Sequence, residues 1–133
     1  MGKVVRMRRH LLVISIACSI LLTACVTQAE SASRPGEQQV AWGETVYRHE
    51  CARCHASGRS GPELDARALV QYGNANQLYQ FISATMPLDR PGTLPDEDYW
   101  DVTAYLLAER EMLQLPEAET LRPENAEDVN LAP

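Results

Sequence analysis

Apolar and polar positions divide the chain of 133 residues into four segments of different character. Residues 11–22 are almost wholly apolar, residues 25–39 are mainly polar, residues 40–112 carry apolar side chains at helical spacing, and residues 113–133 are acidic with three prolines. Only the third segment has enough regularly placed apolar side chains to build a core. We therefore predict one small domain at 40–112, which a flexible tether precedes and a disordered tail follows.

Four helices are predicted within this domain, and no stretch has the alternating pattern of a strand. Asn74, with Gln77 three residues later, forms a start similar to a capping box, and Pro95 suits the first turn of the last helix. We therefore predict an all-α fold of three to four helices. The helices are expected at about 40–51, 64–72, 74–85 and 96–112.

The N-terminal segment has the pattern of a secretory signal peptide. Its first ten residues are basic, and the apolar run at 11–22 follows directly. A transmembrane helix needs about 20 apolar residues, so this run is too short for one. We expect the signal to occupy residues 1–24 and the protein to be exported, with its location on the periplasmic side of a membrane.

The end of this segment, Leu22-Thr23-Ala24-Cys25, resembles the lipobox of bacterial lipoproteins. The resemblance implies cleavage after Ala24, acylation of Cys25 and attachment to a membrane through lipid. In a Gram-negative organism, the outer membrane is favoured, because Val26 stands where an Asp would retain the lipoprotein at the inner membrane. The alternative is an ordinary signal peptide with an incidental cysteine.

Charge is unevenly distributed along the chain. Four of the twelve basic residues lie in the first nine positions, whereas all eighteen acidic residues lie at Glu30 or later. The chain after the signal therefore has a net charge of −10. Such a surface argues against nucleic-acid binding and suits a protein partner with a basic docking patch.

The segment Cys51-Ala52-Arg53-Cys54-His55 is the attachment pattern of a covalent haem c. Two thiols three residues apart on a helical turn can each add to one vinyl group of the porphyrin. The next residue, His55, then directs its imidazole at the iron. We predict one haem c that is attached through Cys51 and Cys54 and has His55 as an axial ligand.

Three other interpretations of this segment are weaker. A zinc site would crowd two cysteines and two histidines into seven residues, which is too tight for a closed tetrahedral site. A redox dithiol of the thioredoxin type would need a βαβ context, and the sequence shows none. A structural disulfide between Cys51 and Cys54 would leave His55 without a role.

The sixth position of the iron requires another ligand or stays open. After the signal, the methionines are Met86 and Met112. Met86 ends a predicted helix and precedes Pro87, so its thioether can face back toward the iron, whereas Met112 suits packing in the last helix. We predict His55 and Met86 as the axial pair. Such ligation raises the reduction potential relative to two histidines and suits an electron carrier.

Together, these features resemble a bacterial class I cytochrome c with a single haem, over about residues 40–112. The resemblance implies that Gly43 lets the first helix cross the last one closely near Tyr105. It also implies that the Pro62 carbonyl accepts a hydrogen bond from the imidazole of His55, which would fix the orientation of the ring. The residues that carry the resemblance are Gly43, Tyr47, the Cys51–His55 segment, Gly61-Pro62, Leu64, Met86-Pro87 and Tyr105-Leu106-Leu107.

Two departures from the family pattern stand out. Ala56 replaces the usual glycine after the haem histidine. Met86 follows His55 by only 31 positions, which is short for this family. We therefore expect a more exposed haem edge and a lower reduction potential than a better-buried haem would have.

The function expected from these features is one-electron transfer without catalysis on a substrate. The partners would be redox proteins such as a dehydrogenase, a quinol-oxidising complex, an oxidase or a reductase. Two alternatives stay open. The chain could be the cytochrome subunit of one dehydrogenase complex, or a haem enzyme or gas sensor whose sixth position is open.

Overall fold

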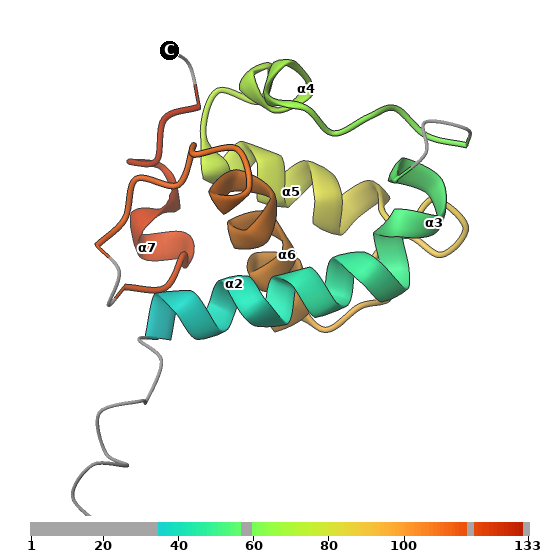
Figure 1. Cartoon of the computed structure of the whole chain (residues 1–133), viewed down its shortest axis with the longest axis horizontal. Coiled ribbons are helices and arrows are strands. Elements are labelled where there is room, and N and C mark those ends of the chain that lie inside the picture. Colours follow the sequence, from blue (N-terminus) through green and yellow to red (C-terminus); the bar gives the residue numbers. More distant parts are fainter. Residues whose placement is uncertain (1–34, 57–59, 117–118, 132–133) are drawn as a thin grey trace, which may run out of the picture. The chain divides into compact units, whose positions relative to one another are not determined.

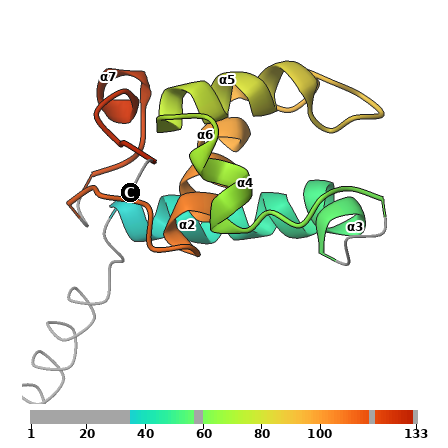
Figure 2. The same cartoon turned by 90° about the horizontal axis from the view of Figure 1, so that it is seen from above.

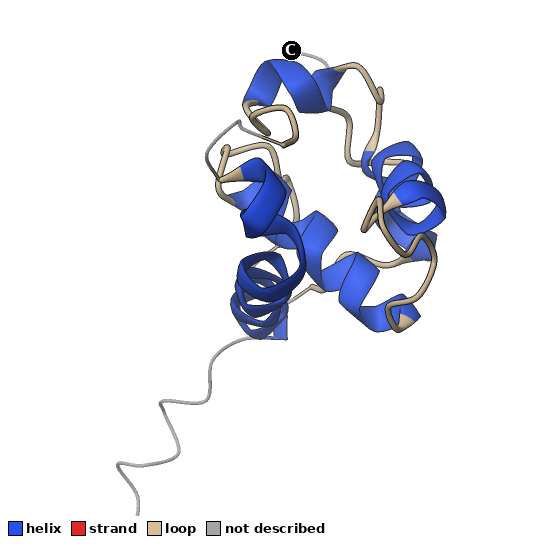
Figure 3. Cartoon of the chain, turned by 90° about the vertical axis from the view of Figure 1, so that its right-hand side faces the viewer, coloured by secondary structure: helices blue, strands red, loops and turns tan. Residues whose placement is uncertain are grey.

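A computed structural model of the chain describes residues 35–56, 60–116 and 119–131, and these residues form helices and loops without a named strand (Figure 3). The predicted all-α fold is confirmed. The expected signal segment and Cys25 lie outside the described residues. The helices are α2 (Pro35–Val46), the π-helix η2 (Tyr47–Cys51), α3 (Ala52–His55), α4 (Ala66–Val70), α5 (Ala75–Thr85), α6 (Asp96–Ala108) and α7 (Pro123–Ala126) (Figure 1).

Helices α2 and α6 cross closely at Gly43. A Cβ atom at this position would lie 1.9 Å from the backbone oxygen of Asp101 and 2.7 Å from the Cβ of Tyr105. Beside the crossing, the rings of Tyr47 and Tyr105 pack with their centroids 5.4 Å apart. The close crossing expected at Gly43 is therefore present, and only a glycine permits it.

Helices α5 and α6 carry most of the core. Asn74 caps α5 because its side chain accepts a hydrogen bond from the Gln77 amide at 2.9 Å. Helix α6 starts after Pro95 with three acidic residues in its first turn, where the helix dipole favours negative charge. The buried side chains of α4, α5 and α6 are Leu69, Ala75, Leu78, Ile82, Tyr99, Trp100, Val102, Thr103, Ala104, Leu106 and Leu107.

The first helix begins five residues earlier than predicted. The tether was expected to reach residue 39, but α2 starts at Pro35, and proline is well suited to the first helical turn. Gln39 is 95% buried, and its side-chain amide exchanges two hydrogen bonds with the backbone of Leu121, at 2.7 and 3.1 Å. A polar residue that binds a distant backbone gives no apolar pattern, which is why the prediction failed.

The C-terminal segment, 119–131, is folded, and the prediction of a disordered tail is wrong for it. Leu121, Ala126, Val129 and Leu131 are all buried. The Ala75 amide donates to the Val129 carbonyl at 3.0 Å, and the Leu131 amide donates to the Gly73 carbonyl at 2.9 Å. Figure 2 shows α7 beside the start of α5. Four apolar side chains therefore hold this acidic segment against the helices.

Within the described residues, none of the helices has the length and apolar character that crossing a membrane requires.

Candidate functional site

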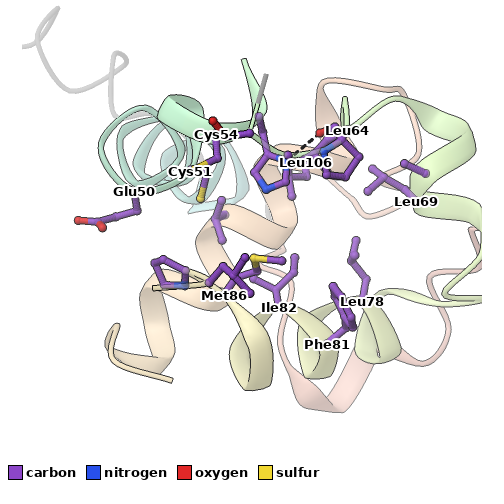
Figure 4. A pocket seen from close by; sticks show the side chains of 18 of the residues that line it. Glu50, Cys51, Cys54, Leu64, Leu69, Leu78, Phe81, Ile82, Met86 and Leu106 are labelled. Carbon is purple, nitrogen blue, oxygen red and sulfur yellow. Dashed lines mark hydrogen bonds between the residues drawn. The ribbon is translucent and has the colours of Figure 1, made fainter. Parts of the chain in front are cut away.

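A cavity of about 560 Å³ lies between the Cys51–His55 segment, α4, α5 and α6 (Figure 4). Its size falls within the range of cavities that bind organic ligands and cofactors. The apolar lining fits a large, mainly apolar group. The apolar residues that line the cavity are Leu64, Ala68, Leu69, Leu78, Phe81, Ile82, Val102 and Leu106, together with Pro62, Pro87 and Leu88.

Both cysteines of the predicted attachment segment line this cavity. Cys51 ends η2 and Cys54 lies in α3, and both thiols are free and half-buried. Burial, and secondarily the Glu50 carboxylate, raise the pKa of the Cys51 thiol to about 11. Reactive dithiols depend on the opposite shift, because the thiolate is the nucleophile. The arrangement therefore gives no support to a thioredoxin-type site.

The imidazole of His55 is oriented by the segment that follows it. Its Nδ1 lies 2.8 Å from the Pro62 carbonyl oxygen, so Nδ1 carries the proton that it donates, and Nε2 is left to bind a metal. The hydrogen bond implied by the family resemblance is therefore present. Gly61 lies against the ring, and a Cβ there would be 2.9 Å from His55 Cε1.

Met86 lines the cavity from the end of α5. It is the first residue after the helix, with an extended backbone, and its amide donates to the Ile82 carbonyl at 2.9 Å. Figure 4 shows Met86 across the pocket from Cys51 and Cys54. Met112, by contrast, packs partly buried against the core and is not among the residues that line the cavity. The thioether predicted as a ligand is therefore at the cavity.

A closed metal site formed by protein side chains alone has no basis in the described segments. No three His, Cys, Asp or Glu side chains among them gather closely enough to hold a metal ion. The zinc interpretation of the Cys51–His55 segment therefore gains nothing from the structure.

Tyr99 is a residue of this site that sequence reasoning missed. It lies in α6 with only 3% of its surface exposed. Its hydroxyl donates to the Met86 carbonyl at 2.8 Å and accepts from the Leu94 amide at 3.3 Å. In the sequence, Tyr99 has only the helical spacing of a core residue, so no local signal links it to Met86.

Two ion pairs, also missed, join the Cys51–His55 region to the loop after Met86. Arg53 binds Asp89 with an N–O distance of 2.5 Å, and Arg90 binds Glu50. The hydrogen bond from Arg53 holds the pKa of the Asp89 carboxyl below its usual value. The partners are 36 and 40 residues apart in the chain, so only the fold reveals the pairing.

Comparisons with known proteins point to one family. A sequence model described as cytochrome c oxidase, cbb3-type, subunit III, matches residues 38–106. Thiosulfate dehydrogenase of Stutzerimonas stutzeri (strain A1501) is 31% identical over an alignment of 84 residues, and the match covers 53% of this chain and 27% of that protein. The chain therefore spans about a quarter of the length of this curated relative. The search of solved structures gives no match.

Proposed function

We propose that this protein carries single electrons through one haem c in its cavity. The chain belongs to the family described as cytochrome c oxidase, cbb3-type, subunit III, and it is therefore a c-type cytochrome. One observation carries the proposal: both thiols of the attachment segment, His55 and Met86 line the same apolar cavity. The haem supplies an iron that alternates between the ferrous and ferric states. The protein binds and orients this group and excludes water from it.

In this proposal, four side chains hold the haem. Cys51 and Cys54 would hold it through thioether links to its vinyl groups, and His55 Nε2 and Met86 Sδ would bind its iron. The hydrogen bond from His55 Nδ1 to Pro62 supports this role because it fixes the tautomer that leaves Nε2 free. The position of Met86, across the pocket from the cysteines, supports its role as the sixth ligand.

The attachment of haem is tested by expressing the full chain with a haem-attachment system. The Soret band should stay with the polypeptide after denaturation, and it should be lost from the variant in which both Cys51 and Cys54 are changed to Ser. An unmodified chain that carries no Soret band would contradict the proposal.

The sixth ligand is tested separately in the ferric holoprotein. Met86→Ala should abolish the weak near-infrared band that arises from a methionine–iron bond, whereas Met112→Ala should keep it. Rapid binding of carbon monoxide to the reduced unmodified protein would instead favour a haem enzyme or a gas sensor.

The location of the protein is part of the proposal. We propose export to the periplasmic side and attachment through lipid on Cys25, at the outer membrane in a Gram-negative organism. The signal pattern of residues 1–24 and the lipobox-like residues 22–25 support it. A Cys25→Ala variant should move from the membrane fraction to the soluble fraction, and unchanged membrane association would contradict lipidation.

A second candidate function is a dedicated subunit of a dehydrogenase complex. The similarity to a thiosulfate dehydrogenase favours a dehydrogenase as the partner. It gives no such support to a quinol-oxidising complex, an oxidase or a reductase. Purification from the native organism distinguishes the two functions. A subunit should co-purify with an enzyme in a fixed ratio, whereas a free carrier should purify alone.

A further inference from the structure

The segment that follows Met86 forms one wall of the haem cavity. We call residues 87–95, between α5 and α6, the Met86 loop. Its first three residues, Pro87, Leu88 and Asp89, line the cavity, and Leu88 is 77% exposed at its rim. Within the loop, the Arg90 amide donates to the Pro87 carbonyl at 2.9 Å, which closes a turn. Because Met86 directly precedes this loop, the position of the loop affects the position of the Met86 backbone.

Tyr99 holds the loop from the inside. Its part-buried hydroxyl bonds to the backbone of Met86, directly before the loop, and to that of Leu94 near the end of the loop. One side chain of α6 therefore fixes both ends of the loop against the core. A phenylalanine at this position would fill the same space but would leave the Met86 carbonyl without this donor.

The two ion pairs hold the loop from the outside. Asp89 and Arg90 belong to the loop, whereas their partners Arg53 and Glu50 belong to the haem-attachment region. The pairs therefore join the wall that carries His55 to the wall that carries Met86. Their side chains are between 25% and 57% exposed, so salt should screen both pairs.

We propose that Tyr99 and the ion pairs Arg53–Asp89 and Glu50–Arg90 are positioning groups that keep the Met86 thioether on the haem iron. The inference rests on the proposed function, in which Met86 is the sixth ligand. An external ligand can bind the iron only in molecules in which Met86 has moved away. Its apparent affinity therefore rises in proportion to the population of that displaced state.

The experiment measures imidazole binding to the ferric holoprotein, which is followed by the shift of the Soret band in every variant and also by loss of the near-infrared methionine–iron band where Met86 is present. Tyr99→Phe should raise the apparent affinity for imidazole about 5- to 30-fold, because it removes the part-buried hydrogen bond that holds the Met86 backbone in place. Tyr105→Phe is the matched control, since this tyrosine of α6 packs on Tyr47 and forms no bond with the loop. Equal affinities in the two variants would overturn the role of Tyr99.

The ion pairs are tested at low salt with Arg90→Gln. This change should raise the imidazole affinity about two- to five-fold, and the increase should disappear at about 1 M salt, whereas the effect of Tyr99→Phe should persist. Arg48→Gln is the control, because Arg48 pairs with Glu44 on α2, away from the loop. Exchange of the charges in the Glu50→Arg, Arg90→Glu double variant should restore the original affinity.

An equal effect of Arg90→Gln and Arg48→Gln would overturn the role of the ion pairs. These surface variants also carry the test if Tyr99→Phe yields no holoprotein. Met86→Ala separates the inference from the proposed function. If Met86→Ala binds imidazole as the unmodified protein does, Met86 is not the ligand and the proposed ligation fails. If Met86→Ala binds imidazole more tightly but the loop variants do not, only the present inference fails.

Discussion

Among single residues, Gly61 and His55 depend most directly on each other. The glycine leaves room for the imidazole, since an added Cβ would lie 2.9 Å from Cε1 and 3.1 Å from Nδ1. This space lets Nδ1 reach the Pro62 carbonyl, and in the proposed ligation that hydrogen bond would make the ring a better electron donor to the iron. The lack of a side chain at Gly61 would therefore influence the reduction potential of a haem bound by His55.

Gly61→Ala should therefore displace the His55 ring and weaken its hydrogen bond. We expect the free energy of unfolding of the holoprotein to fall by about 1–3 kcal/mol, as for other overpacked sites. The reduction potential should rise, because the weaker donor stabilises ferric iron less. Denaturant titration and redox titration measure the two effects. Ser60→Ala, at the exposed residue before Gly61, is the control. Identical results for both variants would contradict the role of Gly61 in placing the His55 ring.

Asp101 gives a prediction about pH. Burial raises the pKa of its carboxyl, although a hydrogen bond from Gln39 and the charge of Arg122 oppose the shift. The folded state therefore holds this proton more tightly than the unfolded chain. The resulting stabilisation is complete below the ordinary pKa of 3.8 and is lost as the pH rises through the raised value.

Asp101→Asn should consequently raise the melting temperature at neutral pH, where the ionised carboxylate opposes folding. The gain should shrink as the pH falls to about 4, because the proton then neutralises Asp101 in the folded protein. Thermal unfolding at both pH values measures the difference, and Glu109→Gln is an exposed control. A gain that is the same at both pH values would show that ionisation of Asp101 is not its source.

Some residues of the site could be predicted from the sequence and others could not. Cys51, Cys54 and His55 lie within one helical turn, so their spacing alone reports their chemistry. Tyr99 acts on a backbone carbonyl 13 residues away, through a contact that any buried tyrosine could make. Contacts of this kind depend on how the helices pack, and the sequence contains no local pattern for them.

At the scale of elements, the C-terminal segment and the start of α2 stabilise each other. The side-chain amide of Gln39 exchanges two hydrogen bonds with the backbone of Leu121, and the Leu121 side chain is fully buried. The family match covers residues 38–106, so the segment lies outside the part of the chain that the family defines. Its packing extends the core of this protein beyond the family domain.

Leu121→Ala should reduce the free energy of unfolding by about 2–5 kcal/mol, because it leaves a cavity in the core. Gln80→Ala is the control: its side chain is exposed on α5 and does not line the cavity, and we expect a change of at most about 0.5 kcal/mol. Denaturant unfolding of the holoproteins provides the comparison. If both variants lose the same stability, the C-terminal segment is not part of the cooperative fold.

The elements differ in how well the sequence predicts them. Helices α5 and α6 carry local start signals, Asn74 and Pro95, and their apolar spacing is regular, so both were predicted. The start of α2 and the C-terminal segment have neither feature. They are ordered by long-range contacts, such as the pairing of Gln39 with Leu121, that apolar periodicity does not record.

For the whole molecule, the net negative charge does not describe the charged side chains beside the cavity. The chain after the predicted signal has a net charge of −10, whereas Glu50 and Asp89, which line the cavity, are paired with Arg90 and Arg53. The exposed Leu88 and Phe81 add apolar surface there.

The proposed function requires one haem, bound by His55 and Met86, that exchanges single electrons without changing its ligands. An optical redox titration of the full holoprotein tests this claim most directly. We expect one reversible one-electron transition, low-spin spectra in both states and a near-infrared methionine–iron band in the ferric state. A high-spin spectrum in either state, or more than one transition, would contradict it.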